Sequence, residues 1–255
     1  MIVRDSAYLD RYKNQTLRDF SYHNYRDGDI DKYLLAAEEL TKRGYYVFRM
    51  GVKVHKPLKS SNIKIIDYAN SKMRSDFMDI YLGANCRFCI STSCGFDSIP
   101  YIFRKPIAYV EQTLYNIRTE RKHDVILLYH HFNKENKKKL TMSEIFSIND
   151  GLFSTTKDYE KGNILLEENS PEEIKNLVIE MDERLENTWK ENDKDLFLQK
   201  KFWTVFQNNI ENIDKTKYSD PKHNWKLFEI NQVKKIKKIA NFSASFLRDN
   251  ENWIQ

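Results

Sequence analysis

The 255-residue chain is 40% hydrophobic and 31% charged. This composition is typical of a folded globular protein and excludes an intrinsically disordered one, and the length allows one large domain with an appendage. The net charge of +5 comes from basic residues set among nearly as many acidic ones, whereas a nucleic-acid-binding protein usually carries a basic stripe. We therefore expect no nucleic-acid partner.

No apolar run in the sequence approaches the ~18–20 residues that cross a bilayer. Residues 1–3 are apolar but lead directly into charged residues, without the pattern of a secretory signal. Cys86, Cys89 and Cys94 are an odd number of cysteines with no further zinc ligands nearby. We expect them to be reduced and to pack as small apolar groups rather than to bind a metal. These features predict a cytoplasmic protein with no transmembrane segment.

The first 110 residues alternate between predicted strands and helices. The segment 29–43 has its apolar residues at helical spacing and is followed by Gly44, and Ser75 is a candidate N-cap. In chain order the sequence predicts a strand at 1–3, a helix at 29–43, strands at 45–50 and 63–66, a helix at 75–84, a strand at 87–90, a helix at 97–103 and a strand at 106–110. This order predicts a Rossmann-like α/β fold, in which a parallel sheet carries helices on both faces.

The second half is more helical. Thr141 with Glu144, and Ser170 with Glu173, have the spacing of capping boxes that start helices. In chain order the sequence predicts a strand at 125–129, a helix at 140–148, a strand at 163–166, and helices at 170–185, 196–210, 232–240 and 245–248. We expect a Rossmann-like domain over 1–190 and a helical extension over 191–255 packed on it. The basic run 234–238 is either a solvated helix face or a weak peripheral contact with an anionic membrane.

The turn from Ser91 to Gly95 is the most informative segment. It follows a predicted buried strand and precedes a helix, and Ser91, Thr92 and Ser93 bring three hydroxyls to it. Gly95 permits a tight turn, and the free N–H groups of a helix terminus attract anions. A diphosphate is a natural occupant. The alternative is that the hydroxyls only cap the helix, and the spacing alone does not decide between the two.

Two arginines are expected near the carboxyl ends of the strands, where parallel sheets bind ligands. Arg4 follows the first strand and Arg49 ends the second, so each is a candidate to bind phosphate or, alternatively, to pair with a carboxylate. Arg26 is a further candidate to face the ligand, although Asp29 beside it is a natural helix cap.

Two carboxylates form a third candidate group. Asp76 and Asp79 lie three residues apart near one face of the predicted helix 75–84. That spacing suits an acid–base or metal role, and it equally suits capping of the helix.

Several motifs, in order along nearly the whole chain, resemble a family of bacterial glycosyltransferases found in surface-polysaccharide gene clusters. The motifs are YRDGDI at 25–30, GYYVFRMG at 44–51, IDYA at 66–69, RSDFMDI at 74–80, STSCG at 91–95, FRKP at 103–106, ENSPEEI at 168–174 and FLRDNENW at 246–253. The family is assigned the GT-B architecture, two Rossmann-like domains with the nucleotide-sugar donor held mainly by the second. Family members are usually longer, and their counterpart of residues 2–8 falls mid-chain, so the resemblance implies that this chain corresponds to the donor-binding part.

The resemblance implies transfer of a sugar from a nucleotide-sugar donor to a surface-polysaccharide or glycoconjugate acceptor. The diphosphate would be bound by Arg4, Arg49, Ser91, Thr92, Ser93 and Gly95, with Arg26, Asp76 and Asp79 as further candidates. The nucleotide sugar is a co-substrate, and we expect no cofactor and no metal; the catalytic base is not identified. The alternatives are a non-catalytic nucleotide-binding module that lacks the acceptor domain, and a GT-B-like nucleotide-sugar epimerase.

A fainter resemblance is to the GDP-fucose-dependent fucosyltransferases. In that family an arginine after a strand and a later Ser/Thr-rich turn hold the diphosphate of the nucleotide sugar. Arg4 and residues 91–93 would be the counterparts here. The histidine that usually precedes the arginine is absent, because Ile2 and Val3 stand in its place.

Overall fold

A parallel four-stranded sheet forms the centre of the computed structural model, which describes all residues except 17–18, 115–116, 118–120, 219, 221–225, 228–229 and 232–239. The strand order is β3-β4-β5-β8, and each neighbouring pair is parallel. The strands are β3 (Cys89–Ser91), β4 (Ile107–Gln112), β5 (Val125–Leu128) and β8 (Asn241–Phe242). All residues of β3, β4 and β5 are buried, as expected for parallel strands that helices cover on both faces.

The first residues of the chain extend this sheet beyond β3. Ile2 donates from its N–H to the Ile90 carbonyl at 2.8 Å and bridges Ser91 in parallel. On its other side, the Met1 carbonyl accepts from the Met50 N–H at 2.8 Å, next to β1 (Val47–Phe48), which pairs in parallel with β2 (Ile65–Ile66). The N-terminal strand therefore lies between β1 and β3, and its carboxyl end points the same way as theirs.

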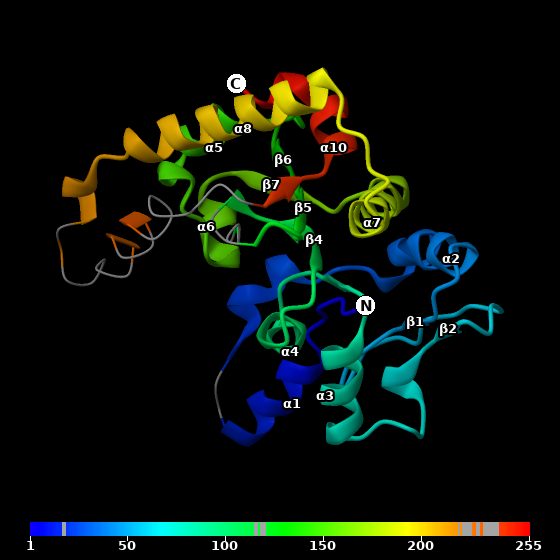
Figure 1. Ribbon diagram of the computed structural model, residues 1–255. Helices are drawn as coiled ribbons and strands as arrows, with labels where there is room; N and C mark the ends of the chain where they lie inside the picture. The colour runs from blue at the N-terminus through cyan, green and yellow to red at the C-terminus, as the bar shows by residue number, and fades with distance from the viewer. Residues whose placement is uncertain are drawn as a thin grey trace.

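Helices cover both faces of the sheet, as Figure 1 shows: α2 and α7 pack together on one side, and α3 and α4 pack together on the other. The long helix α8 crosses the far end of the molecule beside α5 and α10. The helices are α1 (Ala7–Thr16), α2 (Leu34–Lys42), α3 (Asp76–Asn85), α4 (Ser98–Ile102), α5 (Met142–Ser147), α6 (Thr156–Lys161), α7 (Pro171–Leu185), α8 (Asp193–Glu211) and α10 (Ala244–Asp249). The predicted α/β class with a parallel sheet is confirmed.

The predicted helix starts are confirmed at three caps. The Ser75 side chain accepts a hydrogen bond from the Met78 N–H at the start of α3. Thr141 and Ser170 form complete capping boxes with the glutamates three residues later, at the starts of α5 and α7. Each start signal rests on contacts within four residues, which is why the sequence alone reveals it.

Several elements differ from the sequence prediction. The polar stretch after the first strand contains α1 and the 3-10 helix η1 (Ser21–Arg26), and the predicted helix 29–43 begins as a separate 3-10 turn, η2 (Ile30–Tyr33). Strand β6 (His130–Asn133) pairs antiparallel with β7 (Ile164–Glu167); of this pair, only the second strand was predicted. The missed elements depend on partners distant in sequence, so local periodicity does not reveal them.

The C-terminal segment contributes to the sheet as well as to the helical layer. Within 191–255, α8 and α10 follow the helical prediction, but β8 adds a strand beside β5 that the sequence did not predict. The predicted helix 232–240, with its basic run, lies almost entirely outside the described residues. Among the helices that the structure describes, none is long and apolar enough to span a membrane.

Candidate functional site

The carboxyl ends of the N-terminal strand and β3 lie side by side. The Arg4 N–H donates to Thr92 Oγ1 at 2.9 Å, and the Arg4 carbonyl accepts from the Gly28 N–H at 3.0 Å. Arg4 is therefore held on one side by the turn after β3 and on the other by the segment that leads into η2. This crossing point fixes the position of the Arg4 side chain, which is 8% exposed.

The hydroxyls of the turn after β3 are used mainly inside the protein. Ser91 Oγ donates to Asp97 Oδ2 and accepts from the Ser93 N–H, both at 3.0 Å. Ser93 Oγ donates to Gln112 Oε1 at 2.7 Å. Ser91 and Thr92 are buried at 0% and 2% exposure, so in this conformation their hydroxyls act as internal supports of the turn.

The left-handed residue of this turn is Ser93, with φ +58°. Gly95 contributes differently, because a Cβ there would contact no atom within 4 Å. The backbone at the start of η4 (Gly95–Asp97) is therefore open to a ligand. The helix that follows is short, since α4 has only five residues, and a strong helix dipole does not contribute here.

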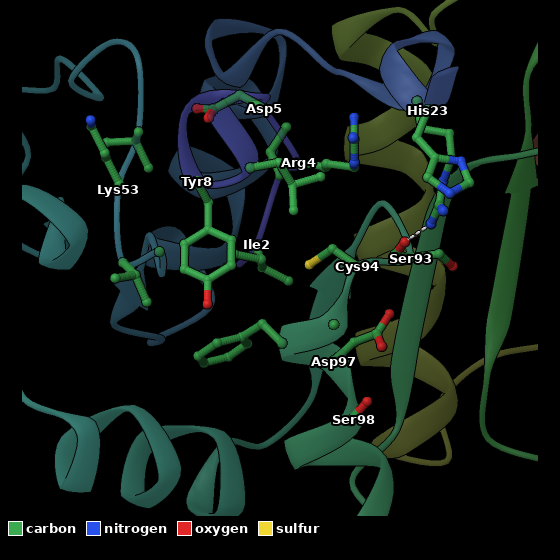
Figure 2. Close-up of a pocket in the computed structure, with 18 residues that line it drawn as sticks. Ile2, Arg4, Asp5, Tyr8, His23, Lys53, Ser93, Cys94, Asp97 and Ser98 are labelled. Carbon is green, nitrogen blue, oxygen red and sulfur yellow. Dashed lines mark hydrogen bonds between the residues drawn. The ribbon is translucent and has the colours of Figure 1, made fainter. Parts of the chain in front are cut away.

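A pocket of about 680 Å³ opens beside this turn; we call it the Ser93 pocket. Four segments form it: the end of the N-terminal strand with the start of α1, η1 through His23 and Arg26, the loop that begins at Gly51, and the turn 93–98. Figure 2 shows the Tyr8 ring projecting into its middle, with Lys53 on one side and His23 on the other. The volume lies within the range of ~300–1,000 Å³ usual for small-molecule sites.

Three cationic side chains line the Ser93 pocket. Arg4 is ion-paired with Asp27, and the Arg26 guanidinium donates to the Ser93 carbonyl. Lys53 is exposed and forms no ion pair within the described part of the chain. Arg26 and Lys53 are therefore the cations of the pocket without a carboxylate partner. The carboxylates that line it, Asp5 and Asp97, accept hydrogen bonds from within the protein, so the two cations favour an anionic ligand.

The pKa of His23 is affected by the positive charges of this pocket. Burial and the positive charges of Arg26 and Arg4 lower the pKa of its imidazole below 6.5, and its buried Nδ1 has no hydrogen-bond partner in the described part of the chain. The neighbouring thiol of Cys94 also lines the pocket, and burial raises its pKa to about 11. Cys94 is therefore a neutral wall of the pocket at neutral pH and a poor nucleophile.

Arg49 lies in a second pocket, of about 330 Å³, on the other side of residues 3–5. We call it the Asp27 pocket. It shares Val3 and Asp5 with the Ser93 pocket. The Arg49 side chain is 1% exposed and pairs with Asp67 at 3.3 Å, so it is part of an internal ion pair and does not line the Ser93 pocket.

The candidate carboxylates of α3 are tied to an arginine outside both pockets. Arg74 Nη2 donates to Asp79 Oδ2 at 2.7 Å and to Asp76 Oδ1 at 3.0 Å. Asp79 is 7% exposed. The two aspartates occupy the first turn of α3, where negative charge is favourable.

The structure thus brings Arg4, Arg26, Ser93 and Gly95 to one pocket and leaves the other candidates elsewhere. It adds Lys53, His23 and Tyr8, which the sequence analysis did not single out. The cysteines behave as expected, since Cys89 is in the core and Cys86 packs against it. Among the described residues, no group of three or more His, Cys, Asp or Glu side chains is arranged to hold a metal ion.

Comparisons with protein-family models, with curated proteins and with solved structures each gave no significant match.

Proposed function

We propose that the Ser93 pocket binds the diphosphate of a nucleotide-sugar donor and that the chain is the donor-binding part of a GT-B-type glycosyltransferase. The observation that carries the proposal is the meeting of Arg4, Arg26 and Lys53 with the open backbone of Gly95 in one 680 Å³ pocket at the carboxyl edge of a parallel sheet. Ligands of such sheets bind at this edge. The reaction class in the proposal comes from the resemblance of the sequence motifs, and the binding site for the diphosphate comes from the pocket.

The arrangement suits a leaving diphosphate. When the bond between the sugar and the diphosphate breaks, negative charge grows on the bridging oxygen. Cations and backbone N–H groups fixed before the reaction stabilise that charge without reorganising. Arg4 and Arg26 are held by Asp27 and Ser93, while Lys53 is exposed and can adapt to the ligand.

The acceptor in this proposal is a surface polysaccharide or glycoconjugate, and the reaction takes place in the cytoplasm. The nucleotide sugar serves as co-substrate, and the cationic side chains of the pocket neutralise its charge. Ser91 and Thr92 act as supports in the proposal rather than as ligand contacts, because their hydroxyls are bonded within the protein. Arg49 does not contact the diphosphate in the proposal, because it pairs with Asp67 and does not line the Ser93 pocket.

A thermal-shift screen tests the proposal. The purified chain is titrated with GDP, UDP, CDP, ADP and their common sugar conjugates. A ligand at about 100 times its Kd stabilises the folded state by about 2.7 kcal/mol, so one nucleotide series should raise the Tm by several degrees. The control is Lys72→Ala, which removes an exposed cation outside the pocket. If no nucleotide shifts the Tm of a cooperatively unfolding sample, the proposal is wrong.

Product analysis then separates the reaction classes. Release of the nucleoside diphosphate that depends on an added saccharide indicates a transferase. Release without any acceptor, or isomerised donor, indicates an epimerase-like enzyme. Binding without any product indicates a nucleotide-binding module.

A further inference from the structure

The Asp27 pocket lies directly across residues 3–5 from the Ser93 pocket. Arg4 lines one pocket and Asp27 lines the other, and the two side chains form an ion pair. A molecule in the Asp27 pocket would therefore be next to whatever the Arg4 side of the Ser93 pocket holds. The two pockets are adjacent, since they share Val3 and Asp5 as lining residues.

Four carboxylates line the Asp27 pocket, and three of them accept hydrogen bonds from backbone N–H groups. Asp5 accepts from the Ala7 and His55 N–H groups, at 3.0 and 3.1 Å. Asp29 caps η2, and Glu168 accepts from the Asp29 N–H at 3.1 Å. These three have structural roles in fixing the loops around the pocket.

Asp27 differs from the other three. Its hydrogen bond within the described part of the chain comes from Arg4 alone, and its side chain keeps 28% exposure. Asp27 is therefore the carboxylate of this pocket that holds no backbone N–H group, and its second oxygen can accept a hydrogen bond from a ligand.

A second observation points to a ligand in the same pocket. Arg49 is 1% exposed and lines the pocket, yet its buried Nε has no hydrogen-bond acceptor among the residues that the structure describes. Its Nη1 is 3.3 Å from Asp67, and its Nη2 is 3.8 Å from Asp5. A buried guanidinium N–H without a partner is costly, and a ligand hydroxyl oxygen that reaches it would satisfy it.

The floor of the pocket is kept open at Gly28. A Cβ there would be 2.7 Å from Glu111 Oε2 and 3.1 Å from Val3, so no side chain can stand at this position without displacing its neighbours. The pocket thus combines an available carboxylate, a buried guanidinium and a bare backbone. Adjacent acceptors and donors of this kind suit a polyol, because each hydroxyl both donates and accepts.

We propose that the Asp27 pocket binds the saccharide acceptor and that Asp27 receives the proton of its attacking hydroxyl. This inference rests on the proposed function of the Ser93 pocket. In the step, the acceptor O–H bond breaks and its proton moves to an Asp27 carboxylate oxygen. The acceptor oxygen forms a bond to the anomeric carbon, and the bond from that carbon to the diphosphate breaks, so that the nucleoside diphosphate leaves with the electron pair.

The protonation behaviour of Asp27 agrees with this role. Burial raises the pKa of its carboxyl to about 6, against the opposing effect of Arg4, while Asp5 and Asp10 raise it further and His55 lowers it. At neutral pH the group is a carboxylate, and its basicity is higher than that of an ordinary aspartate. A base with a pKa close to the working pH is the most effective one.

The test compares Asp27→Asn with Asp31→Asn. Asparagine keeps an oxygen that accepts from Arg4, but it takes up no proton. Asp31 supplies the matched control, because it is exposed, lies in the same segment and does not itself line the pocket, although its partner Lys56 does. The first readout is saturation-transfer NMR of methyl hexosides and N-acetylhexosamine glycosides, with the protein saturated by the nucleoside diphosphate that gives the largest thermal shift.

The expected result is that one glycoside binds the nucleotide-loaded wild type and the Asp31→Asn variant, and binds Asp27→Asn at least tenfold more weakly. Nucleoside diphosphate affinity should stay within threefold in all three proteins. With that glycoside and the sugar nucleotide, the rate of transfer should fall roughly 10²–10⁴-fold in Asp27→Asn, and the wild-type rate should decline as the pH falls through about 6.

The two proposals fail in different ways. If nucleotide binds but no glycoside does, or if Asp27→Asn keeps wild-type glycoside binding and transfer, the acceptor inference is wrong while the function of the Ser93 pocket stands. If Asp27→Asn also loses nucleotide, Asp27 only supports Arg4 and the inference is overturned. If no nucleoside diphosphate binds the wild type, the proposed function itself falls, and the inference with it.

Discussion

The two pockets beside residues 3–5 share a wall but differ in how their charges are used. In the Ser93 pocket, Arg26 and Lys53 have no carboxylate partner within 4 Å among the described residues. In the Asp27 pocket, Arg49 and most of the carboxylates are engaged in internal pairs. The same residue types therefore give an anion-attracting surface on one side and a nearly neutral, hydrogen-bonding surface on the other. What distinguishes the pockets is the partner of each charge rather than the residue composition.

The largest expected effect is a loss of stability on substitution of Arg49, and it tests whether this arginine is structural or binds the ligand. Arg49→Met keeps the apolar stem but removes a guanidinium that is 1% exposed and paired with Asp67. Breaking a buried ion pair leaves one charge uncompensated. The free energy of unfolding measured in urea should therefore fall by about 3 kcal/mol. Nucleoside diphosphate affinity should not change. The exposed Arg104→Met variant is the control, and the opposite pattern, with stability kept and nucleotide affinity lost, would assign Arg49 to the phosphate.

The next effect concerns Glu111, behind the floor of the Asp27 pocket. Its side chain is 3% exposed, and the backbone has φ +56°. No hydrogen bond of ordinary geometry reaches its carboxylate oxygens from the described residues, among which the Tyr33 hydroxyl is a neighbouring donor. Burial, reinforced by Glu168, raises its pKa to about 8. A carboxyl whose folded pKa is raised contributes stability that is full below its ordinary pKa and is lost as the pH rises through about 8.

Glu111→Gln should remove this pH dependence. Relative to the variant, the free energy of unfolding of the wild type should fall by about 2 kcal/mol between pH 6 and pH 8, at about 1.4 kcal/mol per pH unit. Chemical denaturation of both proteins across this range measures the difference. Parallel stability curves would show that Glu111 is already ionised in the folded protein at pH 6.

A smaller effect is expected at Lys53 in the Ser93 pocket. Because the side chain is exposed and forms no ion pair among the described residues, Lys53→Ala should leave the Tm unchanged. It should weaken nucleoside diphosphate binding about fivefold at low ionic strength, and less at high salt. Calorimetry at two salt concentrations checks this. Equal affinities of the two proteins at low salt would remove Lys53 from the site.

The smallest effect is a pH dependence from His23. Nearby cations lower its pKa below 6.5 in the free pocket, and a bound diphosphate should raise it. Binding then takes up a proton, so the affinity of the wild type relative to His23→Gln should rise, roughly threefold, as the pH falls below 6.5. The ratio of the two affinities is independent of the protonation of the nucleotide itself, because that protonation affects both proteins equally. A ratio that does not vary with pH would mean that the anion lies elsewhere.

The sequence predicted the parts of the fold that depend on neighbours along the chain. The caps at Ser75, Thr141 and Ser170 and the buried strands of the sheet are of this kind. Strand β6 was missed because its partner β7 follows some 30 residues later. Strand β8 was missed because it joins β5 more than 100 residues after that strand.

The candidate site was predictable in its location and less so in its members. Arg4 and the turn 91–95 were found because both follow predicted strands. His23 and Arg26 are brought in by η1, which α6 supports: the Tyr25 and Tyr159 rings are 4.9 Å apart, and Thr156 Oγ1 donates to the Ser21 carbonyl at 3.3 Å. No periodicity in the sequence encodes such a contact. The separation of Arg49 from Arg4 into two pockets likewise follows from pairing with Asp67, which only the structure reveals.

The measurement that tests the central claim most directly is calorimetric titration of the best nucleoside diphosphate into three proteins. They are the wild type, the double variant Arg26→Ala/Lys53→Ala and the control Lys72→Ala. The account predicts that the double variant loses at least 30-fold in affinity, about 2 kcal/mol from two lost charged contacts, while the control binds as the wild type does. Equal affinity in all three proteins would contradict the assignment of the Ser93 pocket as the diphosphate site.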